Sequence, residues 1–148
     1  MNKKDIVDAL IPYFQKNERY FFLAADMGFG ATDKLKNTFP DRIINIGIRE
    51  QAMVGIAAGM ALSGMIPIVY SFCNFLAFRA LEQIRNDVVL QNLNVKFIGV
   101  GADNYFDFLG ESHTCNYDDV TILNIIGLKK YDNFNEWIES DKAGYIRV

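Results

Sequence analysis

The chain has 148 residues, of which 51% are hydrophobic and 22% charged, and its formal net charge is -3. This length and composition are typical of a globular domain with a sizeable core, so we expect one domain over residues 1–148. The slightly acidic balance excludes the broad basic surface with which nucleic-acid-binding proteins neutralise phosphates.

The sequence also argues against a membrane or secreted location. Its apolar runs are shorter than a membrane span, and Asp5 and Asp8 follow the basic start too closely for a secretory signal. The two cysteines, Cys73 and Cys115, lack the spacing of a metal site. We therefore expect a cytoplasmic protein with free thiols and assign neither cysteine a catalytic role.

Apolar spacing divides the chain into alternating helices and strands. A first amphipathic helix is predicted from apolar residues at helical spacing, namely Val7, Leu10, Ile11 and Phe14. Continuous apolar runs between turn residues predict strands at residues 20–25, 42–46, 66–71, 95–100, 128–131 and 144–148. Helical patterns predict a short helix capped by Thr32, and further helices at residues 51–63, 75–91, 118–126 and 134–140.

This alternation predicts an α/β fold. Strands that are apolar on both faces are typical of a mostly parallel sheet covered by helices on both sides, which gives three αβα layers. Ligands of such sheets bind beyond the carboxyl ends of the strands. Asp26, Glu50, residues 72–78 and the irregular loop at 101–113 all follow strands, so we expect them to converge on one edge.

Glu50 stands where an apolar strand turns into a helix rich in small residues. It could be a first-turn carboxylate stabilised by the helix N-terminus, an effect of about 0.3–1 kcal/mol. Alternatively, a buried Glu50 could be partly protonated and share its proton with a heterocyclic nitrogen, because burial raises a carboxyl pKa. The residues alone leave both interpretations open; the choice depends on a resemblance to a known family.

The segment GIREQAMVGIAAGMAL, residues 47–62, closely resembles a motif of transketolases and 1-deoxyxylulose-5-phosphate synthases. In that family G-[IV]-x-E-Q-x-M leads into A-A-G-[ML]-A-L. The resemblance continues in order through residues 21–30, 66–88, 94–102, 108–120 and the closing GYIRV. The chain is thus similar to the pyrimidine-binding module of thiamine diphosphate-dependent, transketolase-like enzymes.

The resemblance implies a role for each candidate site residue. Glu50 would hydrogen-bond the ring nitrogen of the cofactor's aminopyrimidine and favour the imino tautomer, whose exocyclic nitrogen takes the thiazolium proton. Phe75 and Phe78, three residues apart, would pack around the pyrimidine, and Phe72 is a further candidate. Asp26 matches an acidic residue near the cofactor. Without the resemblance, the three aromatic rings would be read as core and Asp26 as a turn residue.

His113, the only histidine, stands where the family has the histidine of a G-P-T-H motif, which contacts substrate hydroxyls and assists proton transfer. This chain has Gly110-Glu111-Ser112-His113 instead. The extra carboxylate of Glu111 argues against acidic or phosphorylated substrates, or changes how they are held. Alternatively, it points to solvent.

The family's diphosphate-binding motif, G-D-G followed at a distance by Asn, does not occur in the sequence. The resemblance therefore implies no metal ligand here and a Mg²⁺ (or Ca²⁺) held by a partner. That partner would be a diphosphate-binding, N-terminal-section transketolase subunit, and this chain the small C-terminal-section subunit of a split transketolase. The family's symmetry suggests a 2+2 heterotetramer.

The resemblance implies a transferase that moves a two-carbon ketol unit between sugars or sugar phosphates. Two alternatives stay open at this point: a synthase-like condensing subunit using the same cofactor, and a non-catalytic scaffold or regulatory subunit that retains the fold. The chain could also be an excised piece of a longer polypeptide.

Overall fold

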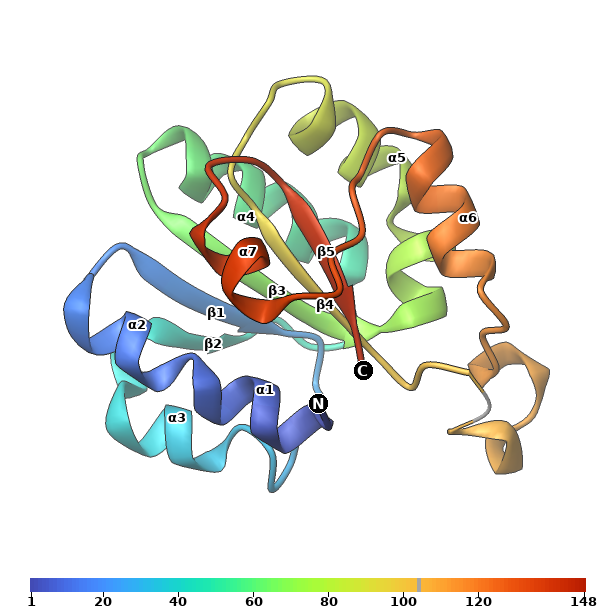
Figure 1. The fold of residues 1–148 in the computed structure, drawn as a ribbon, viewed down its shortest axis with the longest axis horizontal. Coiled ribbons are helices and arrows are strands. Elements are labelled where there is room, and N and C mark those ends of the chain that lie inside the picture. The colour runs from blue at the N-terminus through green and yellow to red at the C-terminus, as the bar shows by residue number, and fades with distance from the viewer. Residues whose placement is uncertain (104) are drawn as a thin grey trace.

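A five-stranded parallel sheet forms the centre of the molecule, with strand order β2-β1-β3-β4-β5 (Figure 1). The computed structural model describes residues 1–103 and 105–148. Each strand is parallel to its neighbours, as predicted. The strands are β1 (Tyr20–Ala24), β2 (Ile43–Asn45), β3 (Ile66–Phe72), β4 (Lys96–Val100) and β5 (Gly144–Arg147).

Helices connect the strands and cover both faces of the sheet. The α-helices are α1 (Lys3–Ala9), α2 (Ile11–Lys16), α3 (Asp33–Thr38), α4 (Glu50–Leu62), α5 (Leu81–Gln83), α6 (Asp118–Ile125) and α7 (Phe134–Glu139). Two π-helical segments flank α5, at Phe75–Arg79 and Ile84–Val89. Short 3-10 turns lie at Pro40–Arg42, Asp107–Leu109 and Glu111–His113.

The alternation of side chains along each strand builds two apolar layers. Leu23, Val69 and Phe97 are neighbours in register and pack on one face with α4, α5 and α6. On the other face, Phe22 and Ile68 pack with α1, α2, α3 and α7. Figure 1 shows the sheet between these two groups of helices, which confirms the three-layer αβα fold.

The predicted elements differ from the observed ones where local geometry overrides the apolar pattern. The first helix divides at Leu10, because the ring of Pro12 cannot continue the helix begun by α1. Residues 128–131 do not form the predicted strand; Lys130 makes only one bridge to Tyr145 of β5. The Thr32 hydroxyl donates to the Gly28 carbonyl instead of capping α3.

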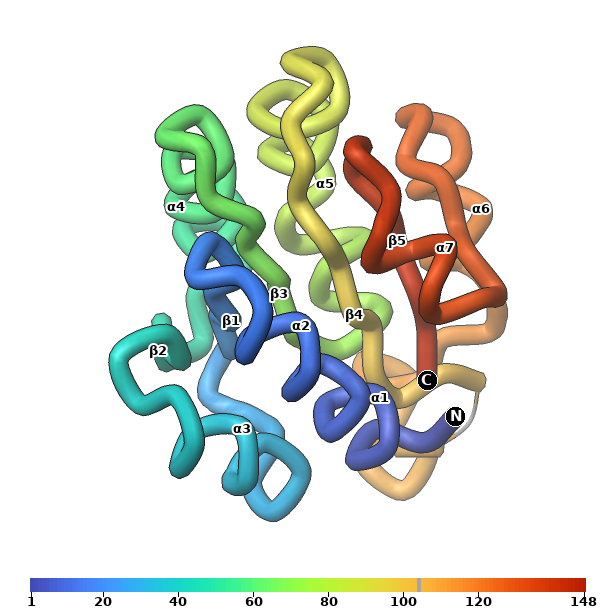
Figure 2. Tube along the Cα trace, turned by 60° about the vertical axis from the view of Figure 1, so that its left-hand side comes forward, coloured from blue at the N-terminus to red at the C-terminus, as the bar shows by residue number. Residues whose placement is uncertain are grey.

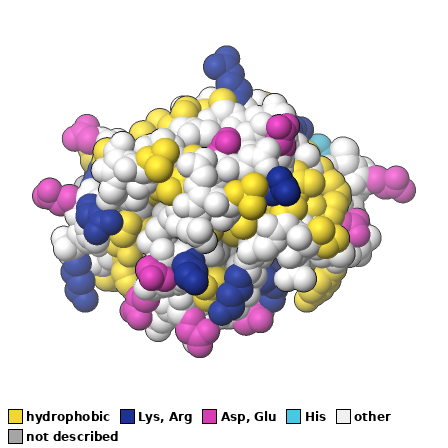
Figure 3. Space-filling view, turned by 90° about the horizontal axis from the view of Figure 1, so that it is seen from above, with side chains coloured by type: hydrophobic (Ala, Val, Ile, Leu, Met, Phe, Trp, Pro, Cys, Tyr) yellow, Lys and Arg dark blue, Asp and Glu magenta, His cyan; other side chains and the backbone are white. Residues whose placement is uncertain are grey.

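The carboxyl ends of β4 and β5 lie beside the two ends of the chain, which are adjacent in both Figure 1 and Figure 2. On the face shown in Figure 3, acidic and basic side chains are interspersed with hydrophobic ones. Within the described residues, the helices are too short or too polar to cross a membrane.

Lys96 of β4 is a buried charge on the face of the sheet that packs with α7. It lies in register with Ile68, is 0% exposed, and donates from Nζ to the carbonyls of Ser140 and Lys142 at 2.7 and 2.8 Å. These bonds tie the chain after α7 to the sheet. Burial lowers the pKa of Lys96 from 10.5 to about 8, against a smaller opposite effect of Asp141.

This shift predicts a pH-dependent stability. Between the two pKa values the folded chain binds fewer protons than the unfolded chain, so the free energy of unfolding rises with pH over this range. The stability that Lys96 contributes in this way is lost as pH falls through about 8. Urea unfolding of the wild type and Lys96→Met should give a difference in unfolding free energy that shifts in favour of the wild type between pH about 7 and about 10. A pH-independent difference would contradict this assignment.

Candidate functional site

A cavity of about 150 Å³ lies beyond the carboxyl ends of β1 and β3. Most of its lining is apolar, with one buried acid and one histidine. The lining residues are Ala25, Asp26, Met27, Ile48, Glu50, Phe72, Phe75 and His113. The structure therefore brings five of the six predicted site residues together and leaves Phe78 outside.

Glu50 is the first residue of α4 and is only 1% exposed. Its Oε1 accepts a hydrogen bond from the Ser71 hydroxyl at 3.1 Å, and its Oε2 pairs with the Arg79 guanidinium at 2.8 Å. Both carboxylate oxygens thus accept a hydrogen bond from a side chain, and the carboxylate lies at the N-terminus of α4. Glu50 is thus a buried, ion-paired acceptor, and the sharing of a proton with a heterocyclic nitrogen stays a prediction.

Sequence reasoning missed both partners of Glu50. Ser71 lies near the end of the mostly apolar strand β3 and is 0% exposed. Arg79 is the first basic residue after Arg49, and its side chain is 42% exposed. The available sequence signal was Arg79 standing alone between two apolar segments. Only the fold shows that its acidic partner is Glu50.

Three rings form one side of the cavity. Phe72 and Phe75 meet edge to face with centroids 5.1 Å apart, and the His113 ring lies 5.5 Å from Phe72 and 5.2 Å from Phe75. The Arg79 guanidinium covers Phe75 at 4.1 Å. Because Phe75 contacts both His113 and Arg79, its ring connects the histidine side of the cavity to the Glu50 ion pair.

Phe78 is not part of this ring cluster. Its side chain is 53% exposed and does not line the cavity. Phe75–Arg79 is π-helical, and the wider π-helical turn removes the alignment that a three-residue spacing gives in an α-helix. Phe78 therefore lies outside the cavity, and its role near a cofactor stays a prediction.

Asp26 connects the ends of β1 and β2. It has a left-handed backbone, with φ of 52°, and exchanges two hydrogen bonds with Asn45. The Asp26 amide donates to Asn45 Oδ1, and Asn45 Nδ2 donates to Asp26 Oδ1, both at 2.9 Å. Asn45 Oδ1 also accepts from the Gly47 amide at 2.9 Å. Asn45, which sequence reasoning missed, thus holds the loop that leads to Glu50.

His113 belongs to a loop that leans on the cavity. Its Nδ1 shares a hydrogen bond with the Ser112 hydroxyl at 3.0 Å, and Asn74 Nδ2 donates to the Ser112 carbonyl. Glu111 is exposed and does not line the cavity, which favours the interpretation that its carboxylate points to solvent.

The two cysteines do not contribute a nucleophile. Cys73 and Cys115 are free and buried, and burial raises the pKa of each thiol to about 12. Both are therefore protonated near neutral pH. Within the part of the chain that the structure describes, no group of three or more His, Cys, Asp or Glu side chains could hold a metal ion.

Most of the chain is similar to one known domain family. Residues 3–123 match the family model for the transketolase pyrimidine-binding domain. The chain is 35% identical over 128 residues to a 6-deoxy-6-sulfo-D-fructose transketolase subunit of Clostridium sp. (strain MSTE9), covering 85% of this chain and 39% of that protein. It is 37% identical over 125 residues to a putative transketolase C-terminal section of Methanocaldococcus jannaschii, covering 84% and 39%. The chain thus spans about two fifths of these relatives.

Solved structures of transketolases have the same fold. The inactive beta4 tetramer of a split-gene transketolase superposes with a TM-score of 0.81 and 28% identity, covering 97% of this chain and 49% of that chain. A Pichia stipitis transketolase with sedoheptulose-7-phosphate gives a TM-score of 0.80 at 15% identity, covering 99% and 25%.

The Glu50–Arg79 ion pair predicts an energetic coupling between the two side chains. Arg79→Met leaves a buried carboxylate with only Ser71 as partner, so the free energy of unfolding should fall by about 1–3 kcal/mol. Combining it with Glu50→Gln should recover part of this loss, because no buried charge then lacks a partner. Urea unfolding of the four proteins measures the coupling, and strictly additive effects would contradict it.

Proposed function

Because the chain belongs to the transketolase pyrimidine-binding domain family, we propose that its Glu50 cavity binds the aminopyrimidine half of thiamine diphosphate. We also propose that residues 1–148 act as one pyrimidine-binding domain of a transketolase-like transferase. The proposed reaction is the transfer of a two-carbon ketol unit between sugars or sugar phosphates.

The cavity fits the size and chemistry of a pyrimidine. A cavity of about 150 Å³ can hold a six-membered ring such as benzene, and this one has the same volume. Phe72 and Phe75 give it aromatic walls, and Glu50 gives it one buried hydrogen-bond acceptor. A flat ring whose nitrogen donates a hydrogen bond satisfies both kinds of contact.

Each residue has a distinct task in this proposal. Glu50 accepts the hydrogen bond from the protonated ring nitrogen, and Ser71 and Arg79 hold its two oxygens in place. Phe72 and Phe75 exclude water from this hydrogen bond, which strengthens it. When bound, thiamine diphosphate supplies a carbon nucleophile that attacks the donor sugar.

His113 is proposed to contact substrate hydroxyls and to move a proton there. With Nδ1 bonded to Ser112, Nε2 is the ring nitrogen that we assign to the substrate. Asp26 is proposed to lie near the cofactor and, through Asn45, to position the segment before Glu50.

The other half of the cofactor needs a second protein surface. The described residues offer no metal-binding cluster for a Mg²⁺–diphosphate group. Large apolar side chains are exposed on the segments that carry the cavity, with Phe29 85%, Ile48 69% and Phe78 53% exposed. Such exposure is typical of surfaces that other protein chains cover.

We propose that a diphosphate-binding, N-terminal-section transketolase subunit covers this surface and holds the Mg²⁺ (or Ca²⁺), in a 2+2 heterotetramer. The relatives described as a transketolase subunit and as a C-terminal section support a divided enzyme. The split-gene relative in its inactive beta4 form supports the need for a second kind of chain.

The observation that carries the proposal is the burial of Glu50 at the cavity, and Glu50→Gln tests it. In the assembled enzyme this variant should lower kcat by about 100-fold or more, because a neutral amide stabilises a protonated ring nitrogen much less than a carboxylate does. Size-exclusion chromatography should show unchanged assembly. Glu82→Gln, an exposed position on α5, is the matched control. Unchanged kcat in Glu50→Gln would support a non-catalytic scaffold instead.

A further inference from the structure

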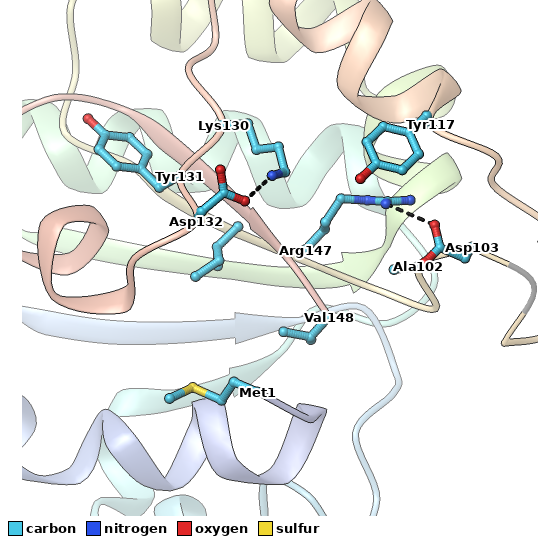
Figure 4. A pocket seen from close by; sticks show the side chains of 10 residues that line it. Met1, Ala102, Asp103, Tyr117, Lys130, Tyr131, Asp132, Arg147 and Val148 are labelled. Carbon is cyan, nitrogen blue, oxygen red and sulfur yellow. Dashed lines mark hydrogen bonds and ion pairs between the residues drawn. The ribbon is translucent and has the colours of Figure 1, made fainter.

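Arg147, at the end of β5, contacts residues on both sides of one loop. Its guanidinium donates from Nη1 to Asp103 Oδ1 at 3.0 Å and from Nη2 to the Cys115 carbonyl at 3.2 Å. The group also stacks on the Tyr117 ring at 4.5 Å. Figure 4 shows Arg147 between Asp103 and Tyr117, with its ion pair to Asp103 dashed.

These contacts join the two ends of one loop, which we call the His113 loop and define as residues 105–114. Asp103 precedes the loop and Cys115 follows it, and the Cys115 amide donates to the Asp103 carbonyl at 3.3 Å. Asp103 and Tyr117 both have left-handed backbones, with φ of 56° and 67°. Such conformations persist where surrounding contacts over-determine them.

The core of the protein holds the Nε side of the Arg147 guanidinium. Its side chain is 7% exposed, and its Nε donates to Oδ2 of Asp119, which is 0% exposed, at 3.1 Å. The Tyr145 hydroxyl donates to the same oxygen. Arg147 is thus held from the core and reaches outward to both ends of the His113 loop.

We call the pairing of Asp103 with Cys115 the neck of the His113 loop. From this neck the loop extends to the cavity. The Phe106 ring meets Phe72 edge to face at 4.7 Å, and a Cβ at Gly101, whose φ is 77°, would overlap Phe106. At the other end, the His113 ring packs on Phe72 and Phe75. Both ends of the loop therefore contact the aromatic rings of the cavity.

We propose that Arg147 is a positioning residue that closes the neck of the His113 loop and thereby holds His113 against the cavity. The importance of His113 to the reaction rests on the proposed function, but the clamp itself does not. Removing the clamp should release the histidine while the sheet and α4 stay folded.

A ligand-binding role for Arg147 is less consistent with its contacts. Arg147 also lines a cavity of about 360 Å³ between Lys130, Asp132 and the chain ends (Figure 4). However, Nε, Nη1 and Nη2 already donate to protein oxygens, and the guanidinium face is covered by Tyr117. These contacts direct the guanidinium to the two ends of the His113 loop, so the geometry favours a clamp.

The experiment uses the single histidine as a probe. His113 is the only histidine of the chain, so the NMR signal of its Cε1–H is unambiguous, and the rings of Phe72 and Phe75 shift that signal. Arg147→Gln should move the signal toward its position in an unstructured peptide. Hydrogen exchange at residues 105–114 should accelerate about tenfold or more, while exchange in α4 should stay unchanged.

Two further variants keep the test decisive. Asp103→Asn removes the charge of one exposed partner, which weakens its contact with Arg147, and leaves the Asp119 pair intact, so it should fold and give a smaller change of the same kind. Arg42→Gln is the matched control, because Arg42 also donates to two carbonyls and stacks on a ring, Phe39, at 4.5 Å. It should leave the His113 signal unchanged.

The outcomes separate the clamp from the proposed function. If Asp103→Asn and Arg147→Gln leave the His113 signal and the loop exchange unchanged, or if exchange accelerates equally throughout the sheet, the clamp is refuted. Both measurements use the chain without cofactor. Unchanged turnover in Glu50→Gln would therefore overturn the proposed function and leave the clamp standing.

Discussion

The buried carboxylate of Glu50 and its two partners are the interaction on which the site depends. Glu50 begins α4, Ser71 lies near the end of β3, and Arg79 ends the π-helical segment that follows. Their contacts at 3.1 and 2.8 Å fix three elements against one another at the carboxyl edge of the sheet. A buried charge is costly unless it is paired, so these elements have one favourable arrangement, which leaves the cavity beside the acid.

The candidate site is an apolar recess that suits only one part of the proposed cofactor, the pyrimidine ring. The recess has aromatic walls, one acid and one histidine, which suits a flat heterocycle. Within the described residues there is no metal cluster to neutralise a diphosphate. Exposed apolar side chains such as Ile48 surround the recess, and the proposed partner subunit would cover them and exclude water from the recess.

The sequence predicts what depends on local pattern and misses what depends on distant contacts. Apolar runs predicted all five strands to within one residue at each end, because buried parallel strands are apolar on both faces. The motif around Glu50 gave the site, and five predicted residues meet there. The partners Ser71, Arg79 and Asn45 were missed since their hydrogen bonds span 19 to 29 residues of sequence. Phe78 does not line the cavity, because periodicity cannot distinguish a π-helical turn from an α-helical one.

Calorimetry of thiamine diphosphate binding tests the central claim most directly, namely that this chain provides only the pyrimidine half of the site. The titration, with Mg²⁺ present, is made into this chain alone, into a candidate diphosphate-binding partner alone, and into their mixture. The account predicts strong binding in the mixture only, and loss of affinity there when Phe75, which lines the cavity, is replaced by Ala. Equally tight binding to this chain alone, or no binding in a mixture that has assembled, would contradict it.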